Sequence, residues 1–285
     1  MIDDAQLTLF LFILMRMTGF MVFNPLLGGR SGVPGLVKAG ASLMLAVAVY
    51  SLTDLPLPTV PTTVVEFAVR SLLELALGYL VAVLVHFFFY VVLQAGQMID
   101  AQMGMNMSET YDPSMGTNVS MTGTLLNIMM ALLFFVAGGH ITLLRILLNS
   151  GQVIPYGAVS FGTSASTYVL EMFASCAVLA MKLCLPILAA ELIGQLGMGI
   201  LMKVIPQINV FAINFELKII LGLAMVILLL PLMGEFVLGL EKQMLVAIEQ
   251  AVKVVAGGSI GPKGGTKHAG RSGRKNRKSH TKKAT

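Results

Sequence analysis

The chain has 285 residues, of which 56% are hydrophobic and 12% are charged, and its mean hydropathy is +0.85. Soluble domains carry about 45–50% apolar residues and about 25% charged ones. A water-soluble protein with so few charges could not cover its own core. The composition therefore indicates an integral membrane protein, and it excludes an ordinary soluble enzyme, a disordered chain and a DNA-binding module.

The net charge of +5 is unevenly distributed. Residues 259–285 carry nine Lys or Arg and no acidic residue, which leaves residues 1–258 with a net charge of −4. We divide the chain into a helical membrane domain at 1–258 and a disordered basic tail at 259–285, because the tail composition cannot bury a core. Attraction to anionic membrane lipids explains such a tail most simply, and its charge predicts a cytoplasmic position.

Six apolar segments are candidates for membrane helices, since about 20 apolar residues cross the hydrocarbon core. Their continuous Leu, Met and Ala content predicts an all-α membrane protein, because a membrane barrel would alternate in polarity. The third segment is too long for one upright crossing, which indicates tilt, breaks or burial in protein. In chain order, the segments are 5–23, 36–52, 64–93, 121–148, 169–202 and 210–233.

Polar or turn-forming stretches separate these segments, at 24–35, 53–63, 100–117, 149–168 and 203–209. The sequence after the sixth segment changes character, with charges recurring every seven residues and apolar residues mostly on the other side. This pattern predicts an amphipathic helix at 235–255 that emerges from the membrane region and docks on a partner or on the lipid interface.

Six simple crossings conflict with the positive-inside rule. A cytoplasmic tail would place the N-terminus inside as well, and the first loop, with Arg30 and Lys38, outside. Some segments are therefore expected to be broken or re-entrant, which a membrane tolerates only where the backbone is buried in protein.

Three charges at the start of the third segment, Glu66, Arg70 and Glu74, are spaced four apart and share one helix face. They could line an ion path, or they could form a self-neutralised stripe at a subunit contact or at the membrane surface. We favour the stripe, because no two acidic residues form a tight motif of the kind that a proton-coupled transporter needs.

The remaining charges within apolar segments are scattered, and each is unfavourable in lipid. Lys182, with Glu171 or Glu191, suggests packing between subunits more than a proton relay. His140, near the end of an apolar segment, is interpreted as a structural residue rather than a titrating one. Arg16, Arg145 and Lys218 complete this group.

Methionine is concentrated in one region, with eight of the 20 methionines between residues 98 and 130. Because Met is unbranched and deformable, a row of methionines around a narrow opening would make a compliant seal. The alternative is that Met simply replaces Leu in a lipid-facing helix. Polar neighbours such as Asn106, Ser108 and Glu109 argue against that alternative. They favour a loop that is buried in a protein channel.

Catalytic, phosphate-binding and metal-binding signatures are missing from the sequence, so neither an enzymatic activity nor a cofactor or metal is predicted. Two further classes remain as alternatives. A secondary transporter for a small solute would need acidic residues that converge in the membrane. An intramembrane enzyme would need a catalytic pair, and the sequence offers none.

Three runs of residues resemble the FliR family of flagellar export-gate proteins, which have counterparts in injectisome type III secretion systems. The first is Gln97–Met105, followed by Asp112 and Pro113. The second is Gly138–Arg145, which leads to Ser150, Ile154 and Pro155. The third is Ile205–Phe211, ahead of Leu217 and Lys218. The resemblance covers about residues 5–255.

The resemblance implies a subunit of a flagellar export gate that passes unfolded polypeptides across the bacterial inner membrane. Such proteins assemble with FliP and FliQ and contact FlhB and FlhA, with helical hairpins stacked in a spiral around a central pore. An injectisome export gate is the alternative role.

The family's pore plug, which lies beside a methionine gasket, corresponds here to about residues 103–122. The resemblance places its gating residues at Met103, Met105, Met107, Glu109, Tyr111, Asp112, Pro113, Met115 and Gly116. Expected subunit contacts are Glu66, Arg70, Glu74, His140, Lys182, Glu191, Pro206, Gln207, Asn209, Phe211 and Lys218.

Overall fold

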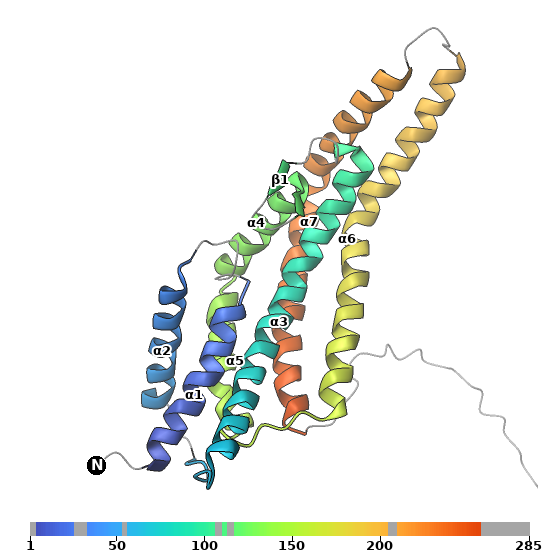
Figure 1. Cartoon of the computed structure of the whole chain (residues 1–285). Helices are drawn as coiled ribbons and strands as arrows, with labels where there is room; N and C mark the ends of the chain where they lie inside the picture. The colour runs from blue at the N-terminus through green and yellow to red at the C-terminus, as the bar shows by residue number, and fades with distance from the viewer. Residues whose placement is uncertain are drawn as a thin grey trace, which may run out of the picture.

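The computed structural model describes residues 4–25, 33–52, 56–105, 110–112, 117–204 and 210–257. These residues form long α-helices and one small antiparallel hairpin (Figure 1), which confirms the predicted all-α membrane fold apart from two strands of three residues each. The elements are α1 (Asp4–Phe23), α2 (Gly35–Leu52), α3 (Val64–Met103), β1 (Thr110–Asp112), β2 (Thr117–Val119), α4 (Met121–Val136), α5 (Gly139–Val153), α6 (Thr163–Val204) and α7 (Val210–Val255).

Helix α3 is the centre of the bundle and packs against α1, α4, α6 and α7. Helices α1 and α2 pair on one side of it, and α6 and α7 pair on the other. The paired α6 and α7 continue beyond the ends of the other helices, as Figure 1 shows at its upper right. One face of α3 is therefore buried along most of the helix, which explains how so long an apolar segment is accommodated.

The sequence determines both ends of α3. The Thr63 side chain accepts a hydrogen bond from the Glu66 backbone N–H at 3.2 Å, and the Glu66 carboxylate accepts one from the Thr62 N–H at 3.0 Å. This arrangement resembles a capping box and satisfies the Glu66 N–H, one of the free N–H groups of the first turn. At the other end, Gly104 adopts a left-handed conformation with φ of 79° and terminates the helix.

Four of the described helices are long and apolar enough to cross a membrane, or five if α4 and α5 together form one broken crossing. Helices α4 and α5 meet at a bend of 68°, so the fourth predicted segment is indeed broken. Gly138, with φ of 77°, stands at the bend. Helix α2 is among the shorter apolar helices and is not one of these candidates, so the number of candidate spans is lower than the six predicted segments.

One predicted boundary is wrong. The polar stretch predicted at 149–168 is helical at both ends, because α5 continues to Val153 and α6 begins at Thr163. The amphipathic helix predicted at 235–255 is the last part of α7, which runs without interruption through Pro231. Its apolar face is covered by the chain's own α3, α4 and α5, and includes the buried residues Val237, Met244, Ile248 and Val252.

Candidate functional site

The Met-rich segment predicted at 103–122 is held between the end of α3 and the start of α4. Met103 is the last residue of α3 and is fully buried. Beyond Gly104, strands β1 and β2 pair in an antiparallel hairpin with Tyr111 opposite Asn118. The sequence pattern indicated a buried loop here and gave no sign of this hairpin.

The structure describes only some of the residues expected to form the plug. Tyr111 and Asp112 lie in β1, and Met105 is half-buried against the hydrophobic core. Met107, Glu109, Pro113, Met115 and Gly116 lie outside the described residues. The assignment of a plug therefore stays a prediction, and what the structure adds is the anchoring of both ends of the segment.

The main anchor is the buried carboxylate of Asp100, in the last turn of α3. Its Oδ2 atom accepts hydrogen bonds from Ser120 Oγ at 2.5 Å and from the Thr122 backbone N–H at 3.0 Å. Ser120 in turn caps α4 by accepting a hydrogen bond from the Gly123 N–H at 2.8 Å. A negative charge is unfavourable at the end of its own helix but favourable at the N-terminus of another, so α4 compensates Asp100 electrostatically.

Two glycines allow this anchor to form. A side chain on Gly96 would collide with the backbone of Gly123, so α3 and α4 approach each other backbone to backbone just beside Asp100. Such an approach brings the first turn of α4 within reach of the carboxylate. The two ends of the segment, at Met103 and Ser120, are thereby held at one place in the bundle.

A second buried polar cluster centres on Arg16 of α1, which is 0% exposed. Its Nε donates to Glu74 Oε2 at 2.6 Å, and its Nη1 donates to Ser150 Oγ at 3.0 Å. Its Nη2 donates to the Ile154 carbonyl oxygen at 3.3 Å, while Glu74 Oε1 accepts from the Gly157 N–H at 2.7 Å. The cluster joins α1, α3, α5 and the turn that follows α5.

Tyr156 covers this cluster, because its ring centroid lies 4.1 Å from the Arg16 guanidinium carbon. Burial raises the pKa of Tyr156 above its ordinary value. A cation on an aromatic face in a dry environment is a favourable contact. Each of the three side-chain nitrogen atoms of Arg16 thus has a partner inside the chain, which makes Arg16 a structural charge.

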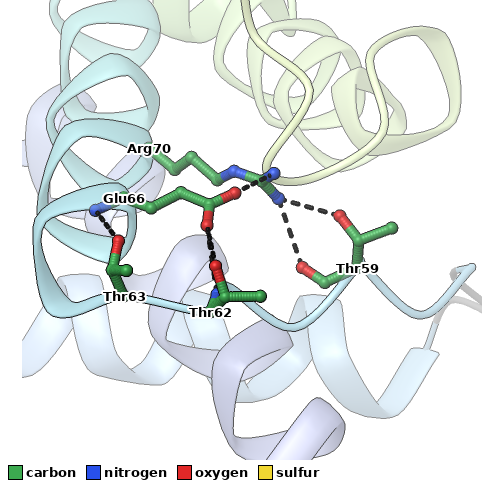
Figure 2. Close-up of polar contacts among 5 residues, drawn as sticks. All are labelled: Thr59, Thr62, Thr63, Glu66 and Arg70. Atoms are coloured by element: carbon green, nitrogen blue, oxygen red, sulfur yellow. Dashed lines mark hydrogen bonds and ion pairs between the residues drawn. The ribbon is translucent and has the colours of Figure 1, made fainter.

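The predicted stripe of Glu66, Arg70 and Glu74 divides into two environments. Figure 2 shows Arg70 between Glu66 and Thr59. On the partly exposed first turns of α3, Arg70 donates a hydrogen bond to Glu66 at 2.5 Å, and it also donates to Thr59 in the stretch before the helix. Glu74 instead turns inward and pairs with Arg16. The stripe is therefore self-neutralised only in its first two members, because a long-range partner from α1 takes the third.

The other expected interface residues occupy varied positions. Lys182 is exposed and makes no ion pair with Glu171 or Glu191 in the part of the chain that the structure describes. His140 is half-buried, with its ring 5.2 Å from that of Phe135. Pro206, Gln207 and Asn209 lie outside the described residues, and Phe211 is known only as a backbone position in α7.

Sequence reasoning missed both buried clusters. Arg16 was one of several scattered charges, and Asp100 was assigned to a polar loop. A signal for the Asp100 anchor did exist, since Ser120 directly precedes an apolar helical run, as N-cap residues do. Among the described residues, no group of three or more His, Cys, Asp and Glu side chains could hold a metal ion.

The fold and these clusters define a helical membrane protein whose Met-rich segment is fastened at both ends to a buried polar frame. Residues 7–244 match the family model of bacterial export proteins, family 1. The chain belongs to this family, and it is a component of a type III secretion export apparatus.

Curated relatives come from both flagellar and injectisome systems. The flagellar biosynthetic protein FliR of Escherichia coli K12 is 26% identical over 232 residues, which are 81% of this chain and 88% of that protein. FliR of Bacillus subtilis 168 is 27% identical over 76% of this chain and 84% of its own length. The surface presentation of antigens protein SpaR of Salmonella typhimurium LT2 is 28% identical over 80% of this chain and 85% of its own length.

Proposed function

We propose that this chain is a subunit of the flagellar export gate, which forms the export pore with FliP and FliQ in the bacterial inner membrane. In this role the Met-rich segment closes the pore to ions and moves aside for an unfolded polypeptide. The observation that carries the proposal is the Asp100 anchor, because it holds the two ends of the Met-rich segment at one place in the bundle.

The uncovered apolar surface of α6 and α7 supports assembly into a larger complex. Only 33% of the most apolar part of α6 is buried within the chain, and only 17% of that of α7. Large side chains such as Leu196, Ile200, Ile227 and Leu228 are about two-thirds exposed or more. Apolar faces of this extent need lipid or partner subunits to cover them. The FlhA and FlhB type components of the export apparatus are further proposed partners.

An injectisome export gate is the second candidate, because SpaR and FliR relatives match the chain at similar identity. Deleting the gene and scoring motility separates the two roles. A flagellar subunit is required for filament assembly, and an injectisome subunit is required for effector secretion instead.

Copurification in gentle detergent, followed by mass measurement of the intact particle, tests the proposal. We expect the chain inside a large hetero-oligomer with FliP-like and FliQ-like subunits. A chain that leaves the membrane alone, and that carries a small solute after reconstitution, would contradict the export role and support a secondary transporter.

A further inference from the structure

One buried carboxyl group in the α6–α7 pair, that of Glu191, has no hydrogen-bond partner within the described part of the chain. The Glu191 side chain is only 1% exposed, and neither of its oxygens has a hydrogen-bond partner among the described residues. One helical turn further along α6, the side-chain nitrogen of Gln195 is also buried and unpaired. Buried polar groups are normally satisfied, and an unsatisfied carboxyl is especially unfavourable in a membrane.

Both groups line a cavity of about 180 Å³ between α6 and α7, together with Lys218. Gly194 and Gly197 also line this cavity. Gly194 faces Leu221 of α7, whereas a side chain on Gly197 would meet nothing within 4 Å, so Gly197 leaves room for a close approach from outside. The cavity lies beside the base of the Met-rich segment, since a side chain on Gly222 would meet both Met103 and Glu191.

The charges and the hydrogen-bonding groups of the cavity restrict what can occupy it. Glu191 and Lys218 carry opposite charges, so a further charged group would remain unbalanced in a medium of low dielectric constant. The Glu191 oxygens need a donor and the Gln195 nitrogen needs an acceptor. A carboxamide offers both in one side chain.

We propose that this cavity receives an Asn or Gln side chain from a membrane helix of a partner subunit. The proposal rests on the proposed function, because it names one contact through which the export gate assembles. The partner helix would pack on the exposed apolar face of α6, and its carboxamide would satisfy Glu191 and Gln195 next to Met103.

A photo-crosslinking amino acid at Met198, which lines the cavity, tests this contact in cells that hold the whole apparatus. The expected result is a cross-link to one partner chain, at a peptide that contains Asn or Gln. Glu191→Leu should reduce the yield of this cross-link about tenfold, which corresponds to the loss of one buried charge-assisted hydrogen bond. Glu171→Gln, an exposed position on the same helix, should leave the yield unchanged.

The thermal stability of the purified chain distinguishes this role from a structural one. Gln195→Leu replaces an unpaired buried polar group by an apolar one and keeps the charge balance of Glu191 and Lys218, so the isolated chain should be at least as stable as the wild type. A residue needed for the fold would lower the stability instead, and that result would overturn the proposal. The double variant Glu191→Leu with Lys218→Leu, which removes both charges together, has the same expectation.

Several outcomes refute the contact. Cross-links to lipid alone, to a peptide without Asn or Gln, or at unchanged yield in Glu191→Leu would each overturn it while leaving the export role intact. A wild-type chain that occurs alone in the membrane would overturn the proposed function as well, so the two failures can be told apart.

Discussion

Replacing Asp100 by Ala should release the first turn of α4 and the hairpin that precedes it. The substitution removes the shared acceptor of Ser120 Oγ and the Thr122 N–H. Each buried donor left unpaired costs about 1–3 kcal/mol. Two donors lose their acceptor, but Ser120 keeps its capping bond to Gly123. We therefore expect the free energy of opening this region to fall by about 2–4 kcal/mol. This loss raises the population of the opened state between about 30-fold and about 700-fold.

Hydrogen exchange of the purified chain, followed by mass spectrometry of its peptides, measures this opening. In Asp100→Ala, peptides that cover 117–126 should exchange faster than in the wild type, by about 30-fold to about 700-fold. Peptides from the middle of α3, at 81–92, should not change, because that part is packed on both sides. Glu171→Gln provides a matched control, since it removes an exposed carboxylate from another helix.

A smaller substitution tests the same reasoning. Ser120→Ala removes the cap of α4 as well as one donor to Asp100, and the loss of such a cap costs about 0.5–2 kcal/mol. The exchange at 117–126 should then rise between about 2-fold and about 30-fold. Equal exchange in all variants and the wild type would show that Asp100 does not hold the hairpin in place.

Three further predictions follow from the two buried clusters and the Met-rich segment. Glu74→Gln leaves the Arg16 charge buried without its counterion and should cost about 3–5 kcal/mol of stability, which is measured as a lower melting temperature in detergent. As a control, Glu66→Gln at the partly exposed pair should cost less than about 1 kcal/mol. Burial raises the pKa of Tyr156 above 10.0, so the stability that the neutral phenol contributes is complete below pH 10.0 and is lost as the pH rises through the raised pKa. The melting temperature of Tyr156→Phe should therefore depend less on pH above 10.0 than that of the wild type. Gly at the methionines of 103–115 should make cells with the assembled apparatus leak ions, and an unchanged conductance would remove the plug assignment.

The sequence predicted the helices well because lipid allows the backbone few alternatives. Each continuous apolar run had to become a helix, and the six runs correspond to α1, α2, α3, the bent pair α4–α5, α6 and α7. Polarity predicted the boundaries less well. Ser, Thr and Gly near 149–168 can continue a helix whose other face is packed, so α5 and α6 extend into the stretch that was expected to be a loop.

The polar clusters could not be predicted, because their partners lie far apart in the chain. Glu74 shares a helix face with Arg70, which made a local pair plausible, yet its partner Arg16 is 58 residues away. Local spacing identifies only the partners that lie on the same helix. Arg16 becomes a partner of Glu74 only because α1 packs on α3. The hairpin of β1 and β2 was missed for a similar reason, since three-residue strands carry too few residues for a periodic pattern.

The two sides of the molecule differ in how completely their buried charges are paired. On the side of α1 and α3, Arg16 and Glu74 neutralise each other within the chain, and the most apolar parts of these helices are 50% and 56% buried. On the side of α6 and α7, Glu191 is buried without a hydrogen-bond partner in the part of the chain that the structure describes, and far less of the apolar surface is covered. Lipid could cover apolar side chains, but it offers no hydrogen bond to Glu191 at the depth of a membrane helix. A protein neighbour satisfies both requirements, so the α6–α7 side is where we expect this subunit to meet the rest of the export apparatus.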